Sequence, residues 1–130
     1  ASRSRWSDVA TEMARHVRDH GFSVVENFVG HGIGRSMHED PQVPNFCTPA
    51  FRKNHDFDLE PGLVIAVERV VNMGSKKVRA LQDHWTQSTV DGRPSAHFEH
   101  TIAITEAGPV VLTAPPAAGE ALEPIGTAGA

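Results

Sequence analysis

The amino-acid sequence predicts an α+β fold in which one helix packs on an antiparallel sheet. Three observations support this class. An amphipathic helical pattern opens the chain, β-branched runs follow it, and short segments rich in Gly, Asp, Pro and Lys separate the later runs. A length of 130 residues suits one domain with a single hydrophobic core.

The first predicted element is a helix from Ser7 to His20, and Gly21 follows it as a stop signal. A strand over Phe22–Val29 comes next, and a glycine-rich turn at 30–34 then ends the regular structure. The helix is predicted from apolar residues at three- and four-residue steps, which are Trp6, Val9, Ala10, Met13, Ala14 and Val17.

A long ordered loop is predicted from Asp40 to Pro61, because four prolines among charged residues disfavour ladder pairing there. Three further strands are predicted over Leu63–Val71, Trp85–Val90 and Ala96–Thr105. The segments between these strands have the composition of turns, so the connections should be antiparallel.

The domain is expected to occupy residues 1–113, and residues 114–130 should form a disordered tail. The tail consists mainly of Ala, Gly, Pro and Glu, and it offers too little apolar surface to offset the entropy of ordering. The chain starts with Ala1 rather than methionine, which suggests that it begins partway through a longer parent.

Charge and composition exclude several classes of partner. The chain has 12 Lys and Arg against 16 Asp and Glu, a net charge of −4, so no global positive field favours nucleic acid. No apolar run approaches the ~18 residues of a membrane span. The single Cys47 fits a reducing compartment and predicts a cytoplasmic protein, although a fragment of a secreted protein would show the same count.

Two histidines flank the glycine-rich segment, His31 within it and His38 just after it. Glycines at alternate positions let the backbone fold tightly, so an imidazole there can approach a metal or a ligand closely. The alternative is a pair of exposed loop histidines with no chemical role.

A carboxylate interrupts each of two apolar strands, at Glu68 and at Glu99. Alternation places Glu68 on one face with Val64, Ala66 and Val70, where a buried carboxylate needs a cation, a metal or solvent. The alternative is a solvated strand face. With His31 these carboxylates form a mixed nitrogen and oxygen set suited to Mn, Fe, Co or Zn, which predicts a divalent-metal hydrolase.

Four segments together carry a family resemblance, the GHGIGRSMHEDPQVPNF run at 30–46, PGLVIAVE at 61–68, WT at 85–86 and FEHT at 98–101. In this order they closely resemble the C-terminal half of type I methionine aminopeptidases, M24-like metallopeptidases with the pita-bread fold. The resemblance spans about Trp6 to Thr113. It implies half of a pita-bread fold and metal-dependent removal of the initiator methionine from nascent proteins and peptides.

The resemblance implies a metal site and a proton-transfer group. His31 matches a metal-ligating histidine, Glu68 a metal ligand that also transfers protons, and Glu99 a carboxylate that bridges two metals. The implied cofactors are two divalent ions, chosen from Co, Mn, Fe and Zn.

The resemblance also implies substrate-binding residues. His38 matches the histidine that contacts the scissile amide and stabilises the tetrahedral intermediate, which makes it a catalytic residue. Met37 and Trp85 fall where the family lines its methionine side-chain pocket. The implied substrate is a nascent polypeptide or peptide with an N-terminal methionine.

The sequence departs from the family at Arg69, where the family has proline, and at His97, which replaces a usual polar residue. The family also draws two aspartate ligands and a further histidine from an N-terminal half that this chain lacks. We therefore expect the chain alone to be weakly active or inactive, with an N-terminal half-domain chain as a possible partner. The alternative is a non-catalytic remnant that binds proteins or peptides.

Overall fold

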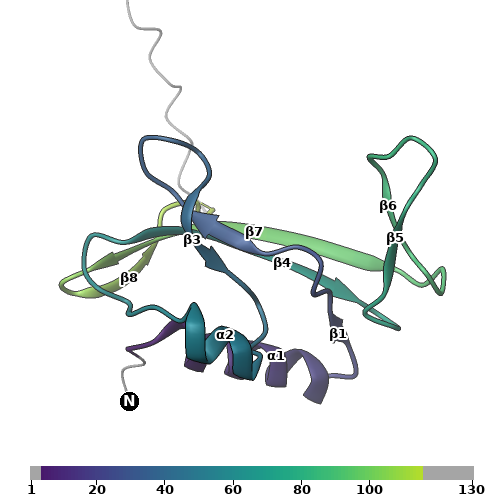
Figure 1. The fold of residues 1–130 in the computed structure, drawn as a ribbon, viewed down its shortest axis with the longest axis horizontal. Helices are drawn as coiled ribbons and strands as arrows, with labels where there is room; N and C mark the ends of the chain where they lie inside the picture. The colour runs from purple at the N-terminus through teal and green to yellow at the C-terminus, as the bar shows by residue number, and fades with distance from the viewer. Residues whose placement is uncertain (1–3, 116–130) are drawn as a thin grey trace, which may run out of the picture.

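The computed structural model describes residues 4–115, and their main sheet has the strand order β3-β2-β4-β7-β8. Strand β1 pairs with β4 off this path, β5 and β6 form a separate hairpin, and all pairings are antiparallel. Both helices lie below the sheet in Figure 1, and the hairpin stands at its far end. The elements are α1 (Trp6–Asp19), β1 (Ser23–Val24), β2 (Gly30–Gly32), β3 (Glu39–Val43), α2 (Pro49–Asn54), β4 (Val64–Asn72), β5 (Val78–Ala80), β6 (Gln87–Thr89), β7 (Ser95–Thr105) and β8 (Gly108–Val111).

Helix α1 confirms the first predicted element to within one residue at each end. Its apolar stripe is buried, including Trp6, Ala10, Ala14 and Val17. Gly21 stops the helix with a φ of 80°, a left-handed conformation that glycine adopts without steric cost. The helix therefore forms where its own sequence pattern predicts it.

The hydrophobic core lies between α1 and the sheet. Ile65 and Val67 of β4 pack in one cluster with Trp6 of the helix and with Val43 of β3. The Trp6 ring stacks on Phe57 with centroids 6.0 Å apart, and its indole N–H donates to the carbonyl oxygen of Pro44 at 2.8 Å. This satisfied tryptophan anchors the start of α1 to the segment before β4.

The prediction of a glycine-rich turn was wrong at its start, because Gly30–Gly32 is strand β2, which lies between β3 and β4 in the sheet. A Cβ atom on Gly30 would collide with the carbonyl oxygen of Ala66, and one on Gly32 with that of Asp40. The glycines are therefore required by the close approach of neighbouring strands rather than by a turn.

Two other predicted segments also differ from the structure. The predicted strand Phe22–Val29 is reduced to the two residues of β1, and the predicted loop from Asp40 to Pro61 contains most of β3 and all of α2. Thr48 caps α2 by accepting a hydrogen bond from the Phe51 amide at 3.1 Å, with Pro49 in the first helical turn.

The predicted strand Trp85–Val90 shortens to β6, and strands β5 and β8 were not predicted. The two long strands agree closely with the prediction, since β4 is shifted from it by one residue at both ends and β7 starts one residue earlier. The tail predicted at 114–130 lies outside the described residues apart from its first two, so that boundary stays a prediction.

Candidate functional site

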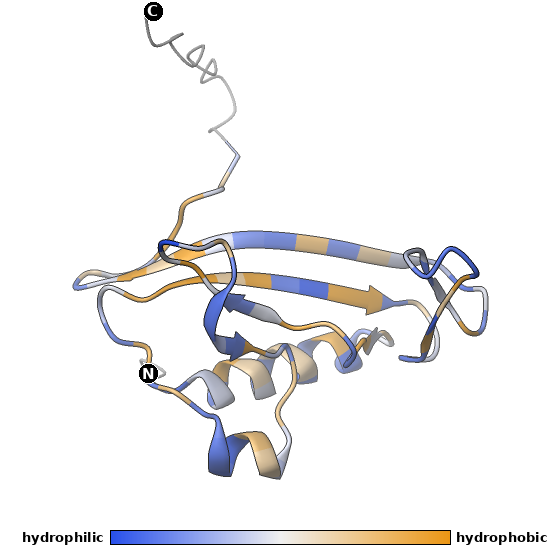
Figure 2. Ribbon diagram, turned by 45° about the horizontal axis from the view of Figure 1, so that its top comes forward, coloured by the Kyte–Doolittle hydropathy of each residue, from blue (hydrophilic) through white to orange (hydrophobic). Residues whose placement is uncertain are grey.

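Glu68 and Glu99 face each other across the two longest strands of the sheet. The β4–β7 register pairs them directly, in an unbroken ladder that runs from Val64 with Ala103 to Asn72 with Ser95. Since Ile65 and Val67 turn toward α1, strand alternation turns Glu68 to the opposite face. Figure 2 shows this hydrophilic interruption between the hydrophobic ends of β4.

Strand β2 brings His31 to the same face. His31 pairs with Ala66, two residues before Glu68 on β4. Its Nε2 lies 3.5 Å from Oε1 of Glu68, and its Nδ1 lies 3.0 Å from the carbonyl oxygen of Gly32. When Nδ1–H donates to that carbonyl, the lone pair of Nε2 faces the carboxylate, which is the arrangement of a metal-ligating histidine.

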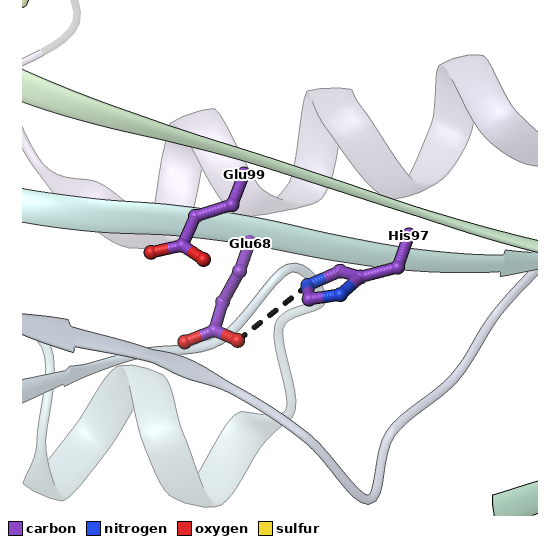
Figure 3. A group of neighbouring side chains, drawn as sticks. All are labelled: Glu68, His97 and Glu99. Atoms are coloured by element: carbon purple, nitrogen blue, oxygen red, sulfur yellow. Dashed lines mark ion pairs between the residues drawn. The ribbon is translucent and has the colours of Figure 1, made fainter. Parts of the chain in front are cut away.

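His97 is a neighbour of Glu68 that the sequence prediction did not select as a site residue. Its Nε2 lies 3.6 Å from Oε2 of Glu68 (Figure 3), whereas His31 lies near Oε1 of the same carboxylate. Ligand atoms of Glu68, His97 and Glu99 all lie within 4.8 Å of one another. The available signal was its position two residues before Glu99, which puts both side chains on one face of β7.

These side chains have the composition of a transition-metal site. Imidazole nitrogens and carboxylate oxygens are the donors that Mn, Fe, Co and Zn accept in proteins. Two carboxylates directly opposite each other repel unless a cation lies between them. The donor set therefore fits a divalent metal, with His31, Glu68, His97 and Glu99 as the residues that could hold it.

The loop between β2 and β3 places His38 against His31. Their rings lie 4.1 Å apart at an interplanar angle of 44°. Glu39 stabilises this loop, because its carboxylate accepts a hydrogen bond from the Ser36 amide at 2.7 Å. Met37, one of the predicted pocket residues, has 73% of its surface exposed. His38 thus joins the predicted site, and Met37 lies in the same loop.

Trp85 lies in the connection between β5 and β6 and is 87% exposed. Asp83 shapes this connection by accepting hydrogen bonds from the amides of Trp85 and Thr86 at 3.1 and 2.9 Å. The pKa of the Asp83 carboxyl is lowered by the hydroxyl of Thr86 and then by these two amides. The structure does not bring Trp85 into contact with the carboxylates of the site.

A cavity of about 380 Å³ borders Glu68 on this face. Its floor includes Glu68 and His97, and its wall comes partly from the β5–β6 hairpin. Apolar side chains at its lining provide a place for a small uncharged group beside the charged donors. The lining residues are Phe28, Glu68, Val70, Val78, Gln87, Ser88, Thr89, Ser95 and His97.

An apolar groove of about 560 Å³ lies on the other face, next to α1. Its lining includes Trp6, Val9, Ile65, Ile102 and Ile104.

Within residues 4–115, no helix is long and apolar enough to cross a bilayer.

Residues 1–106 match metallopeptidase family M24. A methionine aminopeptidase of Clostridium perfringens is 50% identical over 110 residues, which are 85% of this chain and 43% of that protein. Methionine aminopeptidase 1 of Bacillus subtilis is 49% identical over 109 residues, covering 84% of this chain and 42% of the relative. The crystal structure of methionine aminopeptidase from Thermotoga maritima has a TM-score of 0.77 and 44% identity, and covers 85% of this chain and 43% of that one.

These similarities confirm the resemblance drawn from the sequence motifs and the predicted α+β fold with its antiparallel sheet. The solved structures that match this chain include methionine aminopeptidases from two further bacterial sources, and that of Rickettsia prowazekii has a TM-score of 0.76. The chain spans less than half the length of these relatives.

Proposed function

Since this chain belongs to metallopeptidase family M24, we propose that it removes the initiator methionine from nascent proteins and peptides when an N-terminal half-domain chain completes its site. The observation that carries this proposal is the pairing of Glu68 with Glu99 on one sheet face, with His31 at 3.5 Å from Glu68. A strand face that is merely exposed to solvent does not require two opposed carboxylates with a histidine beside them. The relatives named methionine aminopeptidase support the choice of substrate.

The proposed metal ligands are His31, Glu68 and Glu99, with two divalent ions of Co, Mn, Fe or Zn. Such ions, when bound, polarise a scissile carbonyl and lower the pKa of water toward neutrality. Glu68 has a second role in the proposal, because a carboxylate on this face can accept a proton and later release it. Its side chain is 21% exposed, so substrate and solvent can both reach it.

His38 is the proposed contact to the scissile amide. Its ring lies against that of His31, so it is held beside the metal ligands and can donate a hydrogen bond to a substrate placed there. We expect His38→Ala to lower kcat at least tenfold while metal affinity changes little. Loss of metal affinity equal to that of His31→Ala would contradict this division of roles.

Met37 and Trp85 are the proposed residues of the methionine side-chain pocket. Met37 precedes His38 in its loop, and Trp85 belongs to the hairpin that walls the cavity beside Glu68. A flexible thioether and an indole ring suit an unbranched sulfur-containing side chain. We expect Trp85→Ala to lower the preference of kcat/KM for methionine over leucine without changing metal binding.

The apolar groove beside α1 is the proposed contact surface for the N-terminal half-domain chain. The groove borders the core, and its lining includes Ile102 and Ile104, which are only half-buried, and the exposed Pro109. The relatives contain more than half of their length beyond the matched region, which supplies an occupant of the right size.

The test combines this chain with the N-terminal part of the Clostridium perfringens relative that it leaves unmatched. We expect the mixture to release methionine from a Met-Ala-Ser peptide in the presence of Co²⁺ or Mn²⁺, and Glu99→Ala to abolish the release. Glu60→Ala is the matched control, because Glu60 is an exposed glutamate outside the site.

Two outcomes would contradict parts of this proposal. Hydrolysis by the 130-residue chain alone, abolished by Glu99→Ala, would refute the requirement for a second half. No metal uptake by the mixture, measured by calorimetry, would favour the non-catalytic module that binds proteins or peptides. A cytoplasmic location is proposed with the activity, because nascent chains are its substrate and the single cysteine suits a reducing compartment.

A further inference from the structure

We propose that His97 is a metal-binding residue, and that Glu68, His97 and Glu99 bind one divalent transition-metal ion without a contribution from any other chain. The inference rests on the proposed function only in placing a metal at Glu68 and Glu99. It goes beyond that function in two ways. It assigns His97 as a ligand, which the family resemblance does not do, and it expects the chain to bind one ion without an N-terminal half-domain chain.

The backbone places the three donors where one ion can reach them. Glu68 and Glu99 are direct cross-strand partners, and His97 lies two residues from Glu99 on the same face of β7. His97 is therefore a diagonal neighbour of Glu68, within reach of a long side chain. Because the ladder continues on both sides of these residues, the strands fix the positions from which the side chains extend.

The distances suit a shared ion better than a direct contact. Nε2 of His97 lies 3.6 Å from Oε2 of Glu68, which is longer than a normal N–H···O hydrogen bond. Two donors bound to one tetrahedral ion at ~2.1 Å lie about 3.4 Å apart. Since the ligand atoms of the group all lie within 4.8 Å of one another, small side-chain adjustments suffice to close the site.

The two oxygens of Glu68 face different histidines. Oε1 lies 3.5 Å from Nε2 of His31, whereas Oε2 lies 3.6 Å from Nε2 of His97. Figure 3 shows the imidazole of His97 aimed at Glu68, with the carboxylate of Glu99 beside that of Glu68. His97 thus adds a nitrogen donor on the side of Glu68 that His31 does not reach.

A protonated His97 paired with Glu68 is the competing explanation of this geometry. The His97 side chain is 51% exposed, and an exposed ion pair contributes only about 0–1 kcal/mol. The two explanations separate chemically, because lysine keeps a positive charge near Glu68 but is protonated at neutral pH and does not bind a metal. His97→Lys preserves the ion pair and removes the ligand.

The experiment titrates the full 130-residue chain with Co²⁺ and follows both the heat of binding and the visible absorption of the ion. We expect one Co²⁺ per chain, and a Kd that rises about tenfold or more in both His97→Gln and His97→Lys. His100→Gln is the matched control. It lies on the same strand with its side chain on the opposite face, where Nδ1 contacts the Thr113 hydroxyl at 3.0 Å, and it should bind as the parent does.

A second measurement needs no variant. Addition of Zn²⁺ to the parent chain should shift the Nε2 resonance of His97 and leave that of His100 unchanged. Circular dichroism establishes that the variants keep the fold, which we expect because half of the His97 side chain is exposed.

The inference is overturned if His97→Gln and His97→Lys bind Co²⁺ with the affinity of the parent, or if only the glutamine variant binds more weakly. Its failure is distinct from failure of the proposed function. If His31→Gln alone weakens binding and the complemented mixture still hydrolyses Met-Ala-Ser, the function stands and the role of His97 falls. If His97 binds the ion and the mixture is inactive, the role of His97 stands and the function falls.

Discussion

The two faces of the β4–β7 strand pair use the same backbone for opposite purposes. On the face toward α1, Ile65 and Val67 are buried in the core. On the other face, Glu68 and Glu99 oppose each other and two histidines lie near Glu68. One face therefore stabilises the fold, and the other holds charges close together in a way that a stable sheet would avoid. This separation lets the site vary without loss of the core.

The largest expected effect is on the core face. Ile65 is 1% exposed, so Ile65→Ala should lower the free energy of unfolding by about 2–5 kcal/mol through lost burial and the cavity left behind. Val64→Ala is the control on the site face, where its side chain is only half-buried. Urea unfolding measures both. An equal loss in the two variants would end the distinction between the faces.

The next largest effect concerns Asp56, whose hydrogen bonds attach the start of α1 to the segment before β4. Asp56 accepts hydrogen bonds from Nε of Arg5 at 2.7 Å and from the Ser7 amide at 2.9 Å. Burial raises the pKa of the Asp56 carboxyl, but the bonds from Arg5 and Ser7 outweigh it, so the pKa lies below its usual range. These bonds to an ionised group stabilise the fold by about 1–3 kcal/mol.

The sign of the pH dependence follows from that lowered pKa. The stabilisation is complete above the unfolded-state pKa of about 3.9, and it is lost as the pH falls through the lower folded-state value. Asp56→Asn should therefore unfold more easily at pH 7, and its difference from the parent should shrink as the pH is lowered in a series of urea titrations. Asp58→Asn is the control, since Asp58 is 54% exposed and lies 3.6 Å from Arg5. A difference that does not change with pH would contradict this cause.

Local signals were enough to predict the elements that form the core face. Helix α1 and strands β4 and β7 each contain their own periodic pattern, and the structure confirms them. Strand β2 was not predicted, because its glycines form a strand only through pairing with β3 and β4, and the nearby carbonyl of Ala66 explains why Gly30 has no side chain. That cause is distant in the sequence, so composition indicated a turn.

On the face that holds Glu68 and Glu99, local pattern likewise predicted some features, whereas others depend on residues that are distant in the sequence. Alternation within a strand placed Glu68 and Glu99 on defined faces before their partners were known. The approach of His97 to Glu68 depends on the register between β4 and β7, which brings together residues that are far apart in the chain. The hairpin that walls the cavity was predicted only in part for a similar reason, since β5 has just three residues.

A smaller effect, of opposite sign, is expected on the site face. In the absence of metal, Glu99→Gln should raise the free energy of unfolding by about 0.2–1 kcal/mol, because it removes the repulsion between directly opposed carboxylates. With saturating Co²⁺ the parent should become more stable than Glu99→Gln, since only the parent gains the binding free energy of the ion. Thermal unfolding with and without Co²⁺ measures this, with Glu60→Gln as the control. Destabilisation in both conditions would show that Glu99 supports the fold.

The smallest expected effect on stability marks the limit of the core face. Phe98 lies on the same face of β7 as Ile102, four residues away, yet it is 73% exposed whereas Ile102 packs against the core. Phe98→Ser should therefore change the free energy of unfolding by less than ~0.5 kcal/mol. Its association with the N-terminal part of the Clostridium perfringens relative should weaken severalfold, because an exposed aromatic ring is typical of a binding contact. Calorimetric titration measures that association, with Phe22→Ser as a control at a phenylalanine that is 40% exposed near the end of α1.

Two outcomes would contradict this prediction. Equal association of the parent and Phe98→Ser would place the partner's contact elsewhere. A large loss of stability in Phe98→Ser would mean that the core extends along β7 beyond the residues that α1 covers.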